Sequence, residues 1–422
     1  MPLKSLYSAL PLSLMLLAST QHSSASDLIN FDDPNTAKLQ QAFQQQQVNV
    51  VQFGDSHTAA DVFTNVLRVK LQSVLGNGGM GWGMPMYFSG QRLSLYGYDN
   101  VGWTPISSRT QSNGNYGLGG LIAVPQYDGA SLTIKAKQNE QRQKFIVSLR
   151  QAPQDGKFIG TDADGQSFQI EAPIKNNSWQ TTSFNAKLPF TIKAENANNS
   201  AIGGWWAQNN NKQGAIVSAL GINGAELSYW NRWNNSWKTE LGTIAPNLII
   251  LAYGTNEAYN DNLDIEHAKS LLVEKIAEIR RASPNSAILL ISAPESLKKT
   301  SGECGIRPIK LNAMQAMQKQ VAQSSHTLFW DWQQAMGGTC SMKAWIQRGE
   351  GRSDGVHFTA SGYQKLGDQL ANDLLELTGH SSNPMTTSPH RVVNANQLDI
   401  VTQQKIGSAK ICLEDNHSCK SI

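Results

Sequence analysis

Three short motifs, far apart in the chain, carry the side chains that a serine hydrolase needs. They are Gly54-Asp55-Ser56-His57, Gly254-Thr255-Asn256-Glu257 and Asp354-Gly355-Val356-His357. Ser56 becomes a nucleophile once a base takes its proton, and His357 is the predicted base. Asp354, three residues before His357, can orient the imidazole, or a backbone carbonyl can do so instead. This combination predicts ester hydrolysis by a serine enzyme.

Donors for the negative charge of the reaction intermediate can also be named. Asn256 offers a side-chain amide, and Gly224 offers a backbone N–H that no side chain shields. The N–H of Ser56 is a third donor. Gly221 competes with Gly224 for the same role, and the sequence leaves that choice open.

Three polar neighbours of these residues have supporting roles in our interpretation. His57 adjoins the nucleophile, but adjacent side chains on a turn diverge, so we expect it to support the site or contact substrate rather than act as the base. Asp55 is expected to hold its own turn by hydrogen bonds. Glu257 either lines the site or caps a helix.

The segments around the motifs predict why these side chains meet. An apolar strand over 48–53 stops at Gly54, and the other motifs follow strands or precede the last helix. Strands that alternate with helices predict a parallel sheet, whose carboxyl edge binds ligands. Five strands are expected, at 48–53, 215–220, 247–253, 287–291 and 327–330, with helices at 58–75, 264–282, 308–323 and after Thr359.

The sequence pattern changes from about Phe88 to Gly204. Periodic helices give way to short β-type runs separated by Gly, Asn, Asp and Pro turns, which predicts an inserted β-sandwich. The predicted organisation is a signal peptide (1–25), a hydrolase domain in two segments (26–87 and 205–380), an inserted domain (88–204) and a tail (381–422).

The N-terminus is typical of an exported protein. Lys4 precedes a short apolar stretch that ends at Ser23-Ser24-Ala25, which predicts a secretory signal peptide cleaved after Ala25. The stretch is too short and interrupted to span a bilayer comfortably, so no stable membrane insertion is expected. An uncleaved anchor is the alternative.

Composition and cysteine content indicate which partners and which compartment to expect. The net charge is +3, and no Lys/Arg cluster suggests a nucleic-acid partner. The four cysteines fit an oxidising compartment and allow three pairings, of which we favour Cys304–Cys340 and Cys412–Cys419. No motif suggests a metal or another cofactor.

For two groups of residues, the sequence does not decide between contact with substrate and a structural or solvent-exposed position. The first is a set of tryptophans that either stack on sugars or pack in the core: Trp205, Trp206, Trp230, Trp233 and Trp237. The second is the pair Arg348 and Arg352, which either meets an anionic substrate or lies in a solvated loop.

Taken together, the motifs resemble those of the SGNH hydrolase superfamily. The resemblance rests on Gly54-Asp55-Ser56, Gly224, Gly254-Thr255-Asn256 and Asp354-Gly355-Val356-His357, and it implies a flavodoxin-like sheet. The motif Gly254-Thr255-Asn256 is followed by Glu257, where the superfamily usually has Asp. More narrowly, Phe53–Thr58 and Gly221–Ala225 resemble periplasmic peptidoglycan O-acetylesterases of Gram-negative bacteria, and the likeness extends over roughly 45–380.

That narrower resemblance implies a substrate. It implies removal of O-acetyl groups from muramic acid residues of peptidoglycan glycan strands, in the periplasm, through an acetyl-enzyme. It also implies that the inserted domain is similar to a carbohydrate-binding module. The alternatives are a peptidoglycan O-acetyltransferase, another carbohydrate or lipid esterase, and a non-catalytic protein that binds wall glycans.

Overall fold

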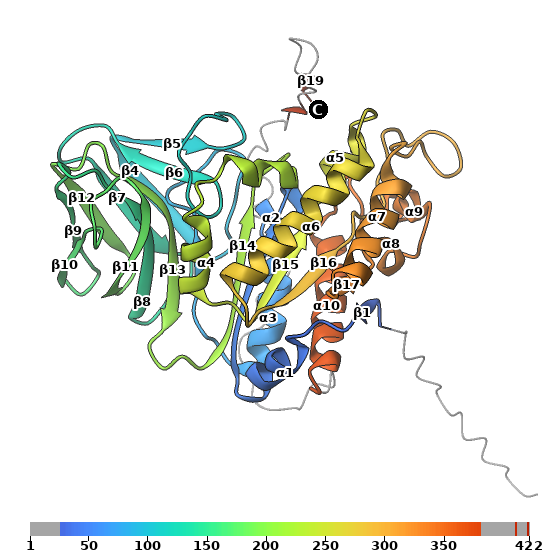
Figure 1. The fold of residues 1–422 in the computed structure, drawn as a ribbon, viewed down its shortest axis with the longest axis horizontal. Coiled ribbons are helices and arrows are strands. Elements are labelled where there is room, and N and C mark those ends of the chain that lie inside the picture. The colour runs from blue at the N-terminus through green and yellow to red at the C-terminus, as the bar shows by residue number, and fades with distance from the viewer. Residues whose placement is uncertain (1–25, 381–409, 412–419, 422) are drawn as a thin grey trace, which may run out of the picture.

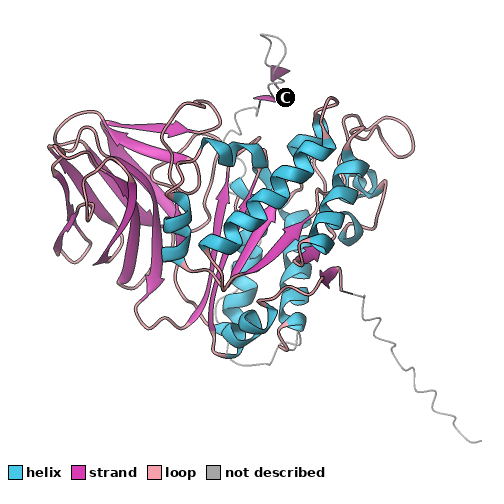
Figure 2. Ribbon diagram, in the orientation of Figure 1, coloured by secondary structure: helices cyan, strands magenta, loops and turns pink. Residues whose placement is uncertain are grey.

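The computed structural model describes residues 26–380, 410–411 and 420–421. A region of strands and helices lies beside a region built almost wholly of strands (Figures 1 and 2). We call residues 81–209 the β region, and 26–80 with 210–380 the α/β region. The predicted signal peptide and the predicted Cys412–Cys419 pair lie outside the described residues.

The central sheet of the α/β region contains the five predicted strands, and every pair of neighbours among them is parallel. An unpredicted strand of three residues pairs antiparallel with the last of them at the edge of the sheet. Within residues 26–380 the sheet therefore has six strands, in the spatial order β1 (Leu28–Asn30), β17 (Leu328–Trp330), β16 (Ala287–Ile291), β15 (Leu248–Ala252), β2 (Gln47–Gly54) and β14 (Gly214–Gly221).

Helices cover both faces of this sheet (Figure 1). Val50 faces α1, α3 and α10, whereas its neighbour Val51 faces the side of α6 and α7. Because both faces of the sheet are buried, the sequences of its strands are continuous runs of apolar residues. The helices are α1 (Thr36–Gln44), α2 (Ser56–Ala59), α3 (Val62–Leu75), η1 (Leu227–Arg232), α4 (Trp237–Ile244), α5 (Thr255–Tyr259), α6 (Ile265–Ala282), α7 (Leu311–Ser324), α8 (Trp332–Ala335), α9 (Ser341–Gln347) and α10 (Ala360–Leu377).

The predicted continuous helix over 58–75 is wrong at its start. It divides into α2 and α3 at Asp61, whose backbone is left-handed with φ 50°. The Asp61 carboxylate accepts hydrogen bonds from Thr64 Oγ1 at 2.5 Å, Arg68 Nη2 at 3.0 Å and the Ser94 N–H at 2.7 Å. These bonds stabilise the break, so α2 is a separate single turn at the end of β2.

The β region contains two antiparallel sheets between residues 81 and 209. Phe190 of one sheet lies 5.1 Å from Phe145 and 5.5 Å from Trp205 of the other, measured between ring centroids, so the sheets pack face to face. One consists of β10 (Ser167–Ile170), β9 (Lys157–Thr161), β12 (Phe190–Glu195), β7 (Ser131–Ala136) and β4 (Tyr96–Val101). The other consists of β11 (Trp179–Ala186), β8 (Gln143–Arg150), β13 (Ala201–Asn209), β6 (Leu121–Pro125) and β5 (Trp103–Ser107), with β3 (Gly81–Gly83) paired to β13.

Glu240 of α4 lies where the two regions meet. It is buried and accepts hydrogen bonds from the Leu118 N–H at 3.2 Å and from the Ser148 hydroxyl, both in the β region. Burial raises the pKa of Glu240 to about 7. The apolar core is also continuous across this junction, so the two regions fold against one another rather than being merely tethered.

The candidate sugar-stacking tryptophans belong to this core. Trp205, Trp206, Trp230, Trp233 and Trp237 are all buried. Trp230 and Trp233 stack at 4.5 Å, and the Trp230 Nε1–H donates to the Tyr253 hydroxyl at 3.0 Å. Packing therefore explains these five residues, and the sugar-stacking hypothesis is wrong for them.

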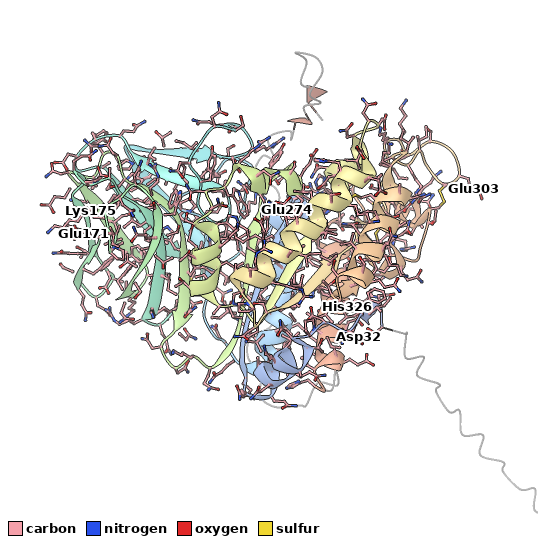
Figure 3. The ribbon with its side chains drawn as sticks, viewed as in Figure 1. Asp32, Glu171, Lys175, Glu274, Glu303 and His326 are labelled. Carbon is pink, nitrogen blue, oxygen red and sulfur yellow. A yellow bond between two sulfur atoms is a disulfide. The ribbon has the colours of Figure 1, made fainter. Side chains whose placement is uncertain are left out.

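The predicted Cys304–Cys340 disulfide is present. Figure 3 shows it beside Glu303, on a loop at the edge of the α/β region. The Cys340 N–H donates at 3.0 Å to Glu295, whose carboxylate also forms an ion pair with Arg307 at 2.5 Å. Near the C-terminus, β18 (Lys410–Ile411) pairs antiparallel with β19 (Lys420–Ser421). No helix in the described residues has the length and apolar character to cross a bilayer.

Candidate active site

Ser56, His357 and Asp354 form one hydrogen-bonded chain. Ser56 is the first residue of α2, directly after β2, and its Oγ lies 2.9 Å from His357 Nε2. The other ring nitrogen, Nδ1, lies 2.9 Å from Asp354 Oδ2. The structure thus brings together the three side chains, and the carboxylate of Asp354, not a backbone carbonyl, orients the imidazole.

The loop before α10 fixes this geometry. Asp354 Oδ1 accepts from the N–H groups of Val356 at 2.8 Å and His357 at 2.9 Å. Burial opposes ionisation of Asp354, but these bonds and the contact with the imidazole prevail and lower its pKa to about 2. Asp354 is therefore a carboxylate at any pH near neutrality, which keeps the proton on Nδ1 and leaves Nε2 as the acceptor for the Ser56 proton.

The three predicted oxyanion donors lie on segments that adjoin the turn of Ser56, because the Ile222 N–H donates to the Gly54 carbonyl at 3.1 Å and Asn256 Nδ2 lies 3.5 Å from Asp55 Oδ2. Within the described residues, neither the Ser56 N–H nor the Gly224 N–H has an acceptor. Asn256, in the first turn of α5, donates from Nδ2 to the Ala225 carbonyl at 2.9 Å, which holds its amide against the Gly224 turn. Free backbone donors and a fixed side-chain amide are the elements of an oxyanion hole.

Gly221 and Gly224 have different surroundings. Gly221 is the last residue of β14, and a Cβ atom there would lie 2.2 Å from the Ala59 backbone nitrogen, so this glycine permits close packing of the strand on α2. Gly224 lies in the turn beyond the strand with φ 70°. This difference favours Gly224 as the oxyanion donor.

The neighbours of the nucleophile serve the local fold. Asp55 caps α2 by accepting from the His57 N–H at 2.9 Å, and burial raises the pKa of Asp55 to about 6. The ring of His57 is buried 5.4 Å from that of His357, and its Nδ1 shares a hydrogen bond with the Tyr363 hydroxyl at 2.8 Å. Burial lowers the pKa of His57 to about 3, so this ring is neutral and packs against the His357 ring.

Glu257 connects the two segments that carry the oxyanion donors. One oxygen accepts from the Gly254 N–H and the other from the Leu227 N–H, each at 2.9 Å. The side chain is buried, and burial raises its pKa to about 8. The sequence left helix capping and lining of the site as alternatives. The bond from the Gly254 N–H, at the N-cap of α5, confirms helix capping. The bond from the Leu227 N–H adds a second role, in which Glu257 fixes the Gly224 turn relative to Asn256.

Comparisons with known proteins agree with this geometry. Residues 78–191 match the family model described as peptidoglycan O-acetylesterase, N-terminal, and residues 183–365 match the GDSL-like lipase/acylhydrolase family. A solved structure of a peptidoglycan O-acetylesterase is 36% identical, with a TM-score of 0.77, and the match covers 84% of this chain and 99% of that one. The chain belongs to the peptidoglycan O-acetylesterase family. The expected SGNH-type fold and serine-esterase class are thereby confirmed.

The similarities of this chain to other solved structures are weaker. A GDSL-like lipase from Parabacteroides merdae is 19% identical with a TM-score of 0.32, over 39% of this chain and 73% of that one. A family two carbohydrate esterase from Cellvibrio japonicus is 10% identical with a TM-score of 0.28, over 68% of this chain and 99% of that one. A search of curated proteins gives no match.

The two family models match only part of the candidate active site of this peptidoglycan O-acetylesterase family member. The acylhydrolase match includes Gly224, Asn256, Asp354 and His357, whereas Ser56 precedes both matched ranges. Its hydrogen bond to His357 is therefore the evidence that places Ser56 in the site. In the described residues, no group of three or more His, Cys, Asp or Glu side chains is placed to hold a metal ion.

Proposed function

We propose that this protein removes O-acetyl groups from muramic acid residues of peptidoglycan through an acetyl-enzyme. The hydrogen-bonded chain from Ser56 Oγ through His357 to Asp354, with both links at 2.9 Å, is the observation that carries the chemistry. Family membership supports the substrate, because the 36% identical relative is a peptidoglycan O-acetylesterase.

In the first half of the proposed reaction, Ser56 Oγ attacks the acetyl carbonyl carbon. Its proton passes to His357 Nε2, and the carbonyl oxygen becomes an oxyanion that accepts from the Ser56 N–H, the Gly224 N–H and Asn256 Nδ2. His357 then gives the proton to the sugar oxygen as its bond to the acetyl carbon breaks. The products are the free sugar hydroxyl and acetyl-Ser56.

In the second half, water replaces the sugar hydroxyl. His357 Nε2 takes a proton from the water as its oxygen attacks the acetyl carbon, and the same donors hold the second oxyanion. The proton returns to Ser56 Oγ as its bond to the acetyl carbon breaks, and acetic acid leaves and ionises to acetate in solution. Asp354 keeps its charge throughout and stabilises the imidazolium that forms in each half.

The proposal includes the organisation of the chain. Residues 1–25 direct export to the periplasm and are removed, 26–87 and 205–380 form the hydrolase domain, 88–204 form an inserted domain, and 381–422 form a tail. The face-to-face sheets support an inserted β-sandwich similar to a carbohydrate-binding module, which would engage the glycan strands. No cofactor and no stable membrane insertion are part of this proposal.

The test is acetate release from O-acetylated peptidoglycan by the purified protein, with Ser56→Ala as the control. We expect release by the native chain and none above background from the variant. Cleavage of 4-nitrophenyl acetate without release from peptidoglycan would retain the esterase chemistry and contradict the substrate. Release by Ser56→Ala equal to that of the native chain would contradict the mechanism.

A further inference from the structure

Three arginines from three separate segments adjoin the candidate active site. The backbone N–H of Arg92 donates at 3.1 Å to the Ala59 carbonyl, at the end of α2. The backbone N–H of Arg352 donates at 2.8 Å to the carbonyl of His357. Arg109, in the loop after β5 of the β region, lies against Gly224. A Cβ atom added to Gly224 would be 3.0 Å from Arg109 Cζ and Nη2.

Among residues 26–380, these guanidinium groups have no hydrogen-bond or ion-pair partner. Among the arginines that the structure describes, four have a side chain without a hydrogen bond or ion pair: Arg92, Arg109, Arg281 and Arg352. Three of those four adjoin the active site. By contrast, Arg348, the other arginine that the sequence suggested for an anionic substrate, pairs with Glu350 at 3.0 Å.

Arg109 is the best placed of the three to act as a specific binding group. Its side chain is half-buried, whereas Arg92 and Arg352 are exposed. Its loop is held in place because Arg232 Nη1 donates to the carbonyls of Ser108 at 2.5 Å and Arg109 at 3.3 Å. A partly desolvated cation on a fixed backbone interacts more strongly with an anion than a solvated one does, and its planar fork matches a carboxylate.

The position of Arg109 also determines where an anion would bind. Gly224 supplies the proposed oxyanion donor, so a carboxylate on Arg109 would lie close to the acetyl ester held at Ser56. Arg92 and Arg352 would extend the positive potential around the site, which attracts an anionic glycan. The β region therefore contributes a side chain to a site that the motifs place wholly in the α/β region.

We propose that Arg109 binds a carboxylate carried by the substrate next to the acetylated sugar, while Arg92 and Arg352, on segments beside the site, add positive charge. This inference rests on the proposed acetylesterase function and names the substrate as an acidic glycan. In muramic acid residues without a peptide, the lactyl ether carries a free carboxylate. Where a peptide is joined to it by an amide bond, the carboxylates of the peptide are the available anions. Neutral acetylated sugars would lack this interaction and bind more weakly.

The test uses two sugars that differ in the lactyl carboxylate. N-acetylmuramic acid and the neutral N-acetylglucosamine would compete with 4-nitrophenyl acetate for the purified protein and for Arg109→Ala. We expect N-acetylmuramic acid to be the stronger inhibitor of the native chain, and Arg109→Ala to weaken it by about tenfold while N-acetylglucosamine is unchanged. Arg109→Lys, which keeps the charge without the fork, should fall between the two.

Arg281→Ala is the matched control, because it removes an unpaired arginine far from the site. Arg281 lies at the end of α6, which precedes β16 and so lies at the amino ends of the strands, whereas the site lies at their carboxyl ends. This variant should leave both inhibition constants unchanged. Arg109→Ala should lose much less activity on 4-nitrophenyl acetate, which carries no carboxylate, than on O-acetylated peptidoglycan. On O-acetylated peptidoglycan, the same variant should raise KM more than it lowers kcat.

Several results would overturn the inference. These are equal inhibition of the native chain by both sugars, an unchanged inhibition constant for N-acetylmuramic acid in Arg109→Ala, or an equal loss of turnover on the neutral ester. Failure of the proposed function gives a different result, in which the native chain releases no acetate from O-acetylated peptidoglycan although it cleaves 4-nitrophenyl acetate.

Discussion

The α/β region and the β region contribute to the site in different ways. In the α/β region, each proposed catalytic or oxyanion residue follows a strand or precedes a helix, so the topology of a parallel sheet dictates its place. In the β region, Arg109 lies in a loop between antiparallel strands and reaches Gly224 through the packing of the two regions. We infer that the first region determines the chemistry and the second determines which esters reach it.

The largest expected effect is loss of the nucleophile or the base. Ser56→Ala and His357→Ala should each lower kcat on any acetyl ester by about 10⁴- to 10⁶-fold, because the proton relay acts as a unit. Asp354→Asn should cost about 10³- to 10⁴-fold, since the amide favours the wrong tautomer. Steady-state rates on 4-nitrophenyl acetate and on O-acetylated peptidoglycan measure this. A loss on one substrate alone would contradict the division of labour between the regions.

Loss of an oxyanion donor should rank second. Asn256→Ala removes the side-chain amide that lies against the Gly224 turn, and it should lower kcat by about 10²- to 10³-fold with little change in KM. Asn211→Ala, at an exposed turn of the chain, is the control and should have no effect. A rise in KM without a fall in kcat would show that Asn256 binds the substrate rather than the transition state.

Glu257→Gln should have a smaller effect of the same kind. The amide offers one acceptor oxygen in place of two, so it cannot satisfy both the Gly254 and the Leu227 N–H groups. We expect kcat to fall roughly tenfold at constant KM, because the donors shift relative to each other. Equal kcat in the native protein and the variant, at equal thermal stability, would show that the bridge has no positioning role.

The smallest expected effect on activity is at the junction of the two regions, where Glu240 acts on stability instead. Glu240 has a pKa of about 7 in the folded state, against 4.5 as its ordinary value, so the folded state holds the proton more tightly. Stability from this group is therefore lost as pH rises from about 5 to 7. Glu240→Gln should lose less stability over that range than the native protein, by at most about 3 kcal/mol. Urea unfolding at pH 5 and pH 8 measures the difference, and identical pH dependence would contradict it.

The sequence predicted most accurately those features that local pattern controls. The five parallel strands and the Asp354–His357 loop have signals in neighbouring residues. The Cys304–Cys340 disulfide was favoured for a different reason, because both cysteines were expected in loops of the hydrolase domain. The three-residue β1 was missed because it is too short to show alternation. The break at Asp61 was missed because its stabilising contact with Ser94 comes from a distant segment.

The remaining site features depend on tertiary packing. Tyr363 meets His57 only because α10 packs behind α2, and Arg109 meets Gly224 only because the β region folds onto the sheet. Neither has a signature in its own segment. Glu257 had one, three residues after Gly254, but its second partner, the Leu227 N–H, lies in a different loop. The tryptophans looked available for sugars because sequence does not reveal which aromatic faces the core covers.

The most direct test of the central claim is to trap the acetyl-enzyme. The purified protein would be mixed with O-acetylated peptidoglycan, quenched in acid within milliseconds, digested and examined by mass spectrometry. We predict an acetyl group on the peptide that contains Ser56, at Ser56 itself, and its absence when His357→Ala is treated in the same way. Acetate release by the native chain with no acetylated Ser56 at any quench time would contradict the account.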